Sequence, residues 1–334
     1  MLGIKGETAM LTRRSTLLGA TLLPFAATAQ APVTLRISTA APPSDFLAKA
    51  CEQLKADLDH AAVGVTASVH PASTLFKQGT EVPALQRGNL EMSTMTTFEV
   101  AQQIPELGFL NRAYLFRDYD HLRRVFDGPI GAEYRKTVAA KMGIEILSTA
   151  YLGTRQVALR AKRKVAAPQD LNGVKMRMPA GPDWLLLGRT IGVDPVPMGM
   201  PEVYLALKTG SIDGQENPLS VFVAAKLYEV SEQVVLTAHM LQPVFFSVAK
   251  PFWDKLALAQ QQAVAAASVA AAKANDDGRL DDERGIVDML KTKGLAVDSP
   301  DLTPFRALAD KVYGEAEAAR VWDAALARRV AETK

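Results

Sequence analysis

The spacing of apolar and polar positions predicts alternating strands and helices over residues 33–95. Val33–Ser38 alternates and is rich in β-branched residues, which indicates a strand. A helix capped by Ser44 or Asp45 follows and runs to about Leu58. After it we expect a strand at 63–69, a helix at 80–87 that ends at Gly88, and a strand at 90–95. This order predicts a mainly parallel sheet flanked by helices, in which ligands bind outside the carboxyl ends of the strands.

A second unit of the same kind begins near Ile144. Its expected elements are strands at 144–148, 155–158, 174–178 and 193–196, helices at 184–191 and 201–209, and a loop at 214–218. Lys250–Lys293 reads as nearly continuous helix, weakened around Asn275–Gly278, and final helices occupy 306–332. A helix of this length in a protein with two domains is expected to bridge both.

Composition is that of an ordinary globular protein, with 334 residues, 48% hydrophobic and 22% charged. The length favours two domains over one. The formal net charge is +2, and no basic stripe is visible, so a nucleic-acid partner is not predicted. The single cysteine, Cys51, excludes an intrachain disulfide and a cysteine-based zinc site, and it reads as a small buried apolar residue.

The N-terminal segment has the pattern of an export signal. Arg13-Arg14 precedes an apolar stretch at 17–27, which ends in small residues suited to signal peptidase. The arginine pair resembles a twin-arginine signal. We expect cleavage after Ala29, so that residues 1–29 are removed and the mature protein lies in the periplasm. A buried N-terminal helix would need amphipathic spacing, which is absent here.

Sequence motifs for catalysis and for metal binding are lacking. The four histidines have no metal-ligand spacing, and there is no nucleophile elbow or phosphate-binding glycine loop. Asp118 and Asp120 form a carboxylate pair of a kind common in polar loops. We therefore predict no catalytic residue, no metal and no cofactor.

Charged and polar residues do gather at strand ends in the second unit. Arg177 lies just before Pro179 at the end of a strand, Arg155 begins another strand, and the loop 213–218 is crowded with hydrogen-bonding groups. An arginine suits a carboxylate because its planar fork donates two parallel hydrogen bonds. A strand-end arginine is also a common surface residue, so these residues alone leave both interpretations open.

Two longer stretches carry a resemblance to a known family. Pro168–Pro179 and Gly192–Pro218, in this order and at this spacing, resemble the solute-binding subunits of tripartite ATP-independent periplasmic (TRAP) transporters. The resemblance covers nearly the whole mature chain. It implies a periplasmic subunit that binds a small organic acid in an interdomain cleft and delivers it to the membrane permease subunits.

The resemblance also implies a fold. We expect an α/β, two-domain periplasmic binding protein fold, type II-like (a Venus flytrap), with a long helix that spans both domains. The expected first domain is 30–152 plus about 241–279, and the second is 153–240 plus about 280–334. We expect a monomer.

For the site, the resemblance implies that Arg177 makes a bidentate salt bridge to the ligand carboxylate. It assigns Arg155 to a second carboxylate position and Asn217 to a hydrogen bond with the ligand. The run 92–98 lacks the pattern of sialic-acid-binding members, so sialic acid is not expected. Further candidates for contact with the ligand are Thr96, Thr97, Trp184, Phe245 and the helix start at Ser44.

The identity of the ligand stays open at this point. A 2-oxo or 2-hydroxy acid, a sugar acid and a C4 dicarboxylate all fit one arginine with polar neighbours. Two arginines favour a dicarboxylate or hydroxy acid, while the aromatic residues favour a larger apolar tail. The alternatives to transport are a periplasmic ligand sensor and an enzyme that acts on a carboxylate substrate.

Overall fold

The computed structural model describes residues 2–4, 6 and 33–334. The arginine pair, the apolar stretch and the cleavage site of the expected signal peptide all lie outside the described residues. Residues 33–334 belong to one compact unit, and the domain boundaries expected from the sequence remain a prediction.

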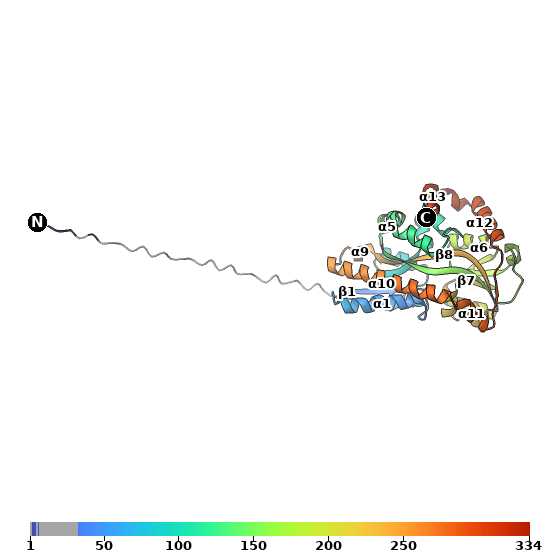
Figure 1. Ribbon diagram of the computed structural model, residues 1–334. Helices are drawn as coiled ribbons and strands as arrows, with labels where there is room; N and C mark the ends of the chain where they lie inside the picture. Colours follow the sequence, from blue (N-terminus) through green and yellow to red (C-terminus); the bar gives the residue numbers. More distant parts are fainter. Residues whose placement is uncertain (1, 5, 7–32) are drawn as a thin grey trace. The chain divides into compact units, whose positions relative to one another are not determined.

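The strands of this unit form one mixed sheet (Figure 1). Their order is β2-β1-β3-β8-β4-β7-β5-β6, and β9 pairs with β8. The parallel pairs β1/β2, β1/β3, β5/β6 and β5/β7 stand on either side of two antiparallel central strands, β4 and β8. We call β2, β1 and β3 the β1 end of the sheet, and β7, β5 and β6 the β5 end. The bounds are β1 Val33–Ser38, β2 Val65–His70, β3 Met92–Thr96, β4 Ile144–Leu159, β5 Lys175–Met178, β6 Asp194–Pro197, β7 Gly214–Pro218, β8 Gln233–Ala249 and β9 Ala296–Asp298.

The two central strands connect the ends of the sheet. Where two short strands were expected at 144–148 and 155–158, β4 is a single strand, because β8 pairs with it along almost its whole length. The pairing register shifts between Ile146 and Ser148, between Tyr151 and Gly153, and between Arg155 and Val157. Such bulges bend a strand and interrupt its hydrogen bonds.

The helices confirm some expectations and correct one. Asp45 caps α1 as expected, because its carboxylate accepts a hydrogen bond from the Leu47 amide. The α-helices in the described part of the chain are α1 Phe46–Ala61, α2 Glu81–Gln86, α3 Thr97–Ala101, α4 Tyr119–Asp127, α5 Pro129–Met142, α6 Pro182–Thr190, α7 Val203–Thr209, α8 Leu219–Ala224, α9 Lys250–Trp253, α10 Leu258–Glu283, α11 Ile286–Thr292, α12 Thr303–Glu315 and α13 Ala324–Glu332.

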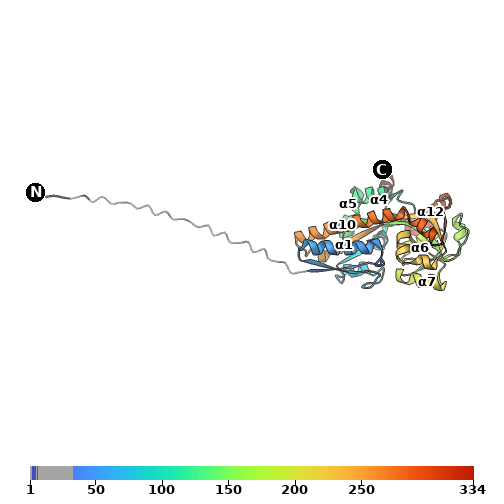
Figure 2. The same cartoon turned by 60° about the horizontal axis from the view of Figure 1, so that its bottom comes forward.

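The helix expected over Lys250–Lys293 is broken into α9, α10 and α11. The weak point expected at Asn275–Gly278 lies inside α10 and stays helical. Gly278 has a packing role there, since a Cβ at this position would come within 2.6 Å of the Phe46 ring. α10 runs beside α1 (Figures 1 and 2) and also packs against β4 and α8, so it spans both ends of the sheet.

Separate apolar clusters cover the two ends of the sheet. At the β1 end, α1 packs on β1 and β2, and Cys51 is buried there; burial raises the pKa of its thiol to about 12. At the β5 end, α6 and α12 cover β5. The last helix, α13, packs through Leu326 and Val330 in a separate cluster with α4, α5 and residues of β3, β4 and β8.

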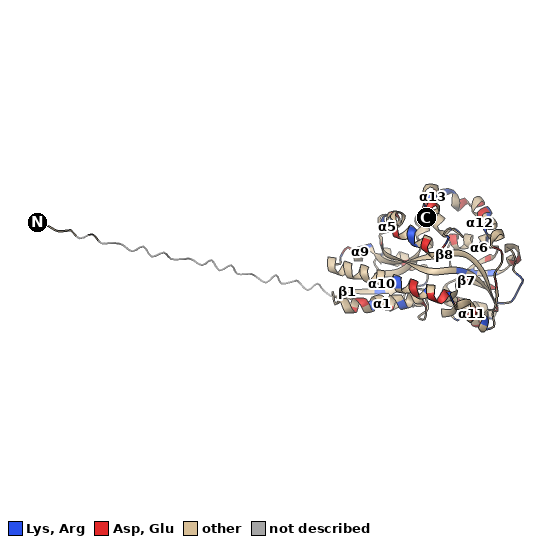
Figure 3. Ribbon diagram, viewed as in Figure 1, with Lys and Arg blue, Asp and Glu red and all other residues tan. Residues whose placement is uncertain are grey.

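On the ribbon, positive and negative residues are interspersed, with no face of a single sign in this view (Figure 3). Ion pairs four residues apart, such as Lys55–Asp59 and Lys273–Asp277, lie on exposed helix faces. Each contributes little to stability because solvent screens the charges.

Candidate functional site

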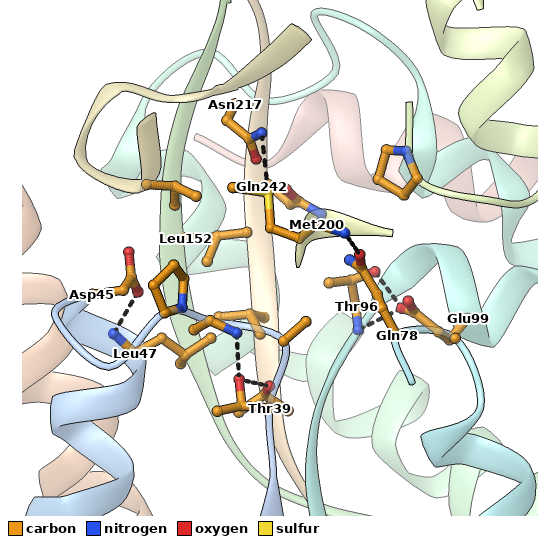
Figure 4. A pocket seen from close by; sticks show the side chains of 18 of the residues that line it. Thr39, Asp45, Leu47, Gln78, Thr96, Glu99, Leu152, Met200, Asn217 and Gln242 are labelled. Atoms are coloured by element: carbon orange, nitrogen blue, oxygen red, sulfur yellow. Dashed lines mark hydrogen bonds between the residues drawn. The ribbon is translucent and has the colours of Figure 1, made fainter. Parts of the chain in front are cut away.

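A pocket with a cavity of about 100 Å³ lies at the carboxyl ends of β1, β3, β5 and β7 (Figure 4). This is the position at which open α/β sheets bind ligands. The β1 end of the sheet contributes residues from four segments: Thr39–Pro42, Asp45 and Leu47, Gln78–Glu81, and Thr94–Glu99. The central strands and the β5 end contribute Leu152, Arg155, Arg177, Pro179, Trp184, Met200, Asn217, Val221, Gln242 and Val244.

Arg155 lines the pocket from β4, and its charge is neutralised within the protein. Its side chain is 2% exposed and forms an ion pair with the fully buried Glu216 through Nε and Nη2. The remaining donors reach Gln242 Oε1 at 2.5 Å and Asn217 Oδ1 at 3.2 Å. Burial favours a raised pKa for Glu216, but Arg155 and His239 outweigh it and hold this pKa below its ordinary value. The pair is therefore ionised, and each nitrogen of the Arg155 guanidinium has at least one acceptor.

Arg177 lines the same pocket from β5, and no described acidic residue forms an ion pair with it, although Glu216 and Glu202 are near enough to attract its charge. It is 1% exposed, and its Nε donates to the Met198 carbonyl at 2.8 Å. Nη2 donates to Gln78 Oε1 at 3.2 Å, and Nη1 donates to no described residue. Burial, the largest cause, lowers the pKa of Arg177 to about 9, which still leaves the guanidinium charged at neutral pH. A buried cation without a counter-ion is a site for an anion.

The pocket wall at the β1 end carries two glutamates. Glu99 accepts hydrogen bonds from the Thr96 amide, at 2.8 Å, and from the Thr96 hydroxyl, so it caps α3. Glu81 accepts a hydrogen bond from the Gly79 amide at 2.8 Å. Burial, reinforced by the nearby Glu99, raises the pKa of Glu81 to about 7, and burial also raises the pKa of Glu99. Sequence reasoning missed this acidic wall, although the Thr96-x-x-Glu99 capping box was a visible signal.

Asp45 is a third carboxylate in the lining, and it belongs to a buried clasp. Its Oδ1 accepts hydrogen bonds from Leu47 N and from Arg279 Nη2, and neither Asp45 nor Arg279 has an exposed side chain. Arg279 also donates to Ser220 Oγ at 2.7 Å, so the clasp ties α1, α10 and α8 together. The second oxygen, Oδ2, is buried without a described partner, and Figure 4 shows it turned away from Leu47.

Five of the residues expected at the site meet in this pocket: Arg177, Arg155, Asn217, Thr96 and Trp184. Trp184 is 4% exposed and stacks on Phe98, with ring centroids 3.5 Å apart. The Arg155 guanidinium lies 4.8 Å from the Trp184 ring centre. Asn217 Nδ2 donates to Gln215 Oε1 at 2.6 Å.

The structure does not bring Phe245, Thr97 and Ser44 into the lining. Successive side chains of a strand point to opposite faces, so Val244 lines the pocket while Phe245 packs against Phe126 and Tyr134 in the core. Thr97 is buried at the start of α3. The Ser44 hydroxyl donates to the Ala224 carbonyl at 3.0 Å, and it is the next residue, Asp45, that lines the pocket.

Two further tests apply to the described residues. No helix among them is long and apolar enough to cross a membrane. Nor does the described part of the chain contain a group of three or more His, Cys, Asp or Glu residues placed to hold a metal ion.

A buried arginine without a described ion-pair partner, in a pocket at the strand ends of an α/β sheet, is suited to binding an anionic solute. The family model of bacterial extracellular solute-binding protein, family 7 (DctP), matches residues 37–319, and the chain belongs to this family. A solute-binding protein of Verminephrobacter eiseniae is 38% identical over 245 residues, which is 70% of this chain and 72% of that protein. The sialic acid-binding periplasmic protein of Vibrio cholerae is 28% identical over 88% of this chain and 91% of its own length.

Solved structures agree with this assignment. A TRAP periplasmic solute-binding protein from Roseobacter denitrificans with bound 3-deoxy-D-manno-oct-2-ulosonic acid has a TM-score of 0.87 and 36% identity, covering 90% of this chain and 99% of that one. A TRAP solute-binding protein from a Polaromonas species bound to D-erythronate has a TM-score of 0.84 and 27% identity, with 90% and 99% covered. The predicted family, the two-domain binding-protein fold and the role in TRAP transport are thereby confirmed.

Proposed function

We propose that this protein binds the carboxylate of a small organic acid on Arg177. The single observation that carries the proposal is the buried guanidinium, which lines the pocket, forms no ion pair with a described residue and has no described acceptor at Nη1. A carboxylate supplies the missing charge and accepts two parallel hydrogen bonds from the planar fork. Acids named with related structures, such as D-erythronate and L-galactonate, carry such a group.

The other pocket residues then have separate roles. Trp184 provides an apolar wall, and Thr96 and Asn217 offer polar atoms to the rest of the ligand. Arg155 supports the site from behind, because Glu216, Gln242 and Asn217 already use its donors. The chemistry in the pocket is that of binding, so we expect the ligand to leave unchanged rather than to be turned over by an enzyme.

Closure of a cleft accounts for capture of the ligand. In our proposal, 30–152 with about 241–279 moves against 153–240 with about 280–334, except that α13 follows the first group. The β4 register shift between Tyr151 and Gly153 falls at this boundary, which supports a hinge there. Gln78 reaches from the β1 end to Arg177 and to the Met200 amide, so contacts across the cleft are available to stabilise the closed state.

The protein acts, in this proposal, as a monomer in the periplasm, after export through its twin-arginine signal and cleavage after Ala29. The closed, ligand-bound form is the one that the TRAP membrane permease subunits recognise. A ligand shifts the equilibrium toward the closed state only to the extent that it binds the closed state more tightly than the open state.

The test begins with a thermal-shift screen of organic acids against the wild-type protein, followed by calorimetric titration of the best binder. Arg177→Ala should lower the affinity by roughly 30- to 5,000-fold, which corresponds to about 2–5 kcal/mol. Arg177→Lys should also lose most of the binding, since an ammonium cannot reproduce the bidentate fork.

Arg284→Ala is the matched control, because this arginine is 75% exposed on its side chain and lies outside the pocket lining. It should bind like the wild type. If Arg177→Ala binds within about threefold of the wild type, the proposal is wrong. Incubation of the ligand with catalytic amounts of protein, followed by mass analysis, should return the ligand unchanged.

A further inference from the structure

Most charges around the pocket balance in pairs, and the exceptions among the described residues are Arg177, Glu81 and Glu99. Arg155 is paired with Glu216, and Arg279 with Asp45. Arg177 is then the one pocket cation among the described residues that has no acidic partner. In the lining from the β1 end, Glu81 and Glu99 form no ion pair with any described residue, and the described donors to them are backbone amides and the Thr96 hydroxyl. The pocket therefore has room for one negative charge, beside Arg177.

Three carboxylates, Glu81, Glu99 and Asp45, belong to the part of the lining that the β1 end contributes. Glu81 and Glu99 lie close enough for Glu99 to raise the pKa of Glu81, so a negative charge on one carboxylate disfavours a negative charge on the other. Asp45 adds the buried Oδ2, which has no described partner and is turned away from Leu47 in Figure 4. A buried acceptor without a donor is costly, and a ligand hydroxyl would supply that donor.

We propose that the ligand is a monocarboxylic acid whose far end carries hydroxyl groups, and that Glu81 and Glu99 determine this specificity. They accept hydrogen bonds from the hydroxyls, and they reject an acid with a second carboxylate at that end. This inference rests on the proposed function of Arg177. In the sequence, the presence of two arginines favoured a dicarboxylate or a hydroxy acid. The structure removes the argument for a dicarboxylate, because Glu216 already neutralises Arg155.

Matched acids test the proposal directly. D-Erythronate and meso-tartrate share a four-carbon skeleton, and D-galactonate and galactarate share a six-carbon one; in each pair the second acid has a carboxylate in place of the terminal hydroxymethyl group. With the wild-type protein, titration should show the monocarboxylate binding at least about 100-fold more tightly, since like charges placed together are strongly unfavourable. Unsubstituted carboxylic acids, which have no hydroxyl groups, should bind more weakly than hydroxylated acids with the same number of carbon atoms.

Variants then assign the effect to residues. Glu81→Gln with Glu99→Gln keeps acceptors in place, and the preference for the monocarboxylate should fall to about tenfold or less. Each single variant should lose part of the preference for the monocarboxylate. The single variants therefore test the proposal even if the double variant folds poorly. Glu52→Gln, an exposed glutamate on α1, is the control and should leave the preference unchanged.

The outcomes separate the two proposals. If the best binder of the thermal-shift screen carries two carboxylates, or no hydroxyl, or if a dicarboxylate binds as tightly as its partner, the inference about Glu81 and Glu99 is overturned, while Arg177 can still be the anchor. If the preference exists but both glutamine variants retain it in full, these residues do not determine it. If no organic acid binds at all, the proposed function fails and this inference falls with it.

Discussion

Arg155 and Arg177 are two buried arginines on strands separated only by β7, yet their surroundings differ completely. Arg155 has Glu216, Gln242 and Asn217 as partners, so its charge is matched and its donors are used. Arg177 has a backbone carbonyl and a neutral amide. The comparison shows that residue type and burial do not identify a binding residue. The decisive property is whether the protein itself supplies the counter-charge.

The largest effect on stability should follow from replacing Arg155, the arginine that is paired with Glu216. Arg155→Met leaves Glu216 buried without its cation, and this should lower the free energy of unfolding of the ligand-free protein by about 3–5 kcal/mol. Denaturant titration followed by circular dichroism measures the change. Adding Glu216→Leu should restore a large part of it, since the unpaired charge is then gone. A single variant as stable as the wild type would refute the matched-pair interpretation.

An unpaired acid should make stability depend on pH. Burial raises the pKa of Glu81 to about 7, so between about pH 4.5 and 7 the folded state holds a proton that the unfolded state has released. The stabilisation is complete below about pH 4.5 and is lost as the pH rises through about 7.

Glu81→Gln removes this dependence. Relative to the wild type, the variant should gain about 2–3 kcal/mol in free energy of unfolding between pH 4.5 and pH 8, and thermal melts of both proteins across this range measure the difference. Parallel stability curves for the two proteins would show that Glu81 does not titrate in this window.

The smallest effect should come from the unpaired arginine. Arg177→Met should change the ligand-free stability by less than about 1 kcal/mol, because removing an uncompensated buried cation offsets the lost hydrogen bonds to Met198 and Gln78. The same denaturant titration applies, with Arg155→Met as the contrast. A loss of 3 kcal/mol or more would mean that Arg177 is mainly structural.

The sequence revealed the pocket only in part. Arg177 was identifiable, because a strand-end arginine before Pro179 sits inside a family motif. β7 was expected to be a loop, since Gln215, Glu216 and Asn217 are polar and show no alternation, but all three are buried between β4 and β5. Glu216 neutralises Arg155 because β7 pairs with β4. These two strands are far apart in the chain, so no local sequence pattern predicts the ion pair.

β8 and α10 illustrate the same limit for the fold. β8 follows no clear alternation, because it lies in the centre of the sheet and is buried on both faces. In α10, Gly278 read as a weak point, whereas the approach of the Phe46 ring requires it. Both features depend on contacts with segments far away in the chain.

The stack of Trp184 on Phe98 has a practical consequence. The chain contains three tryptophans, and Trp184 lines the pocket between a second aromatic ring and the Arg155 guanidinium. Indole emission is sensitive to neighbours such as a stacked ring and a cation, so Trp184 is a natural fluorescent probe in the pocket that we propose for the ligand. With Trp253 and Trp322 changed to phenylalanine, one chromophore would remain, and occupancy of the cleft could be followed in real time without any attached dye.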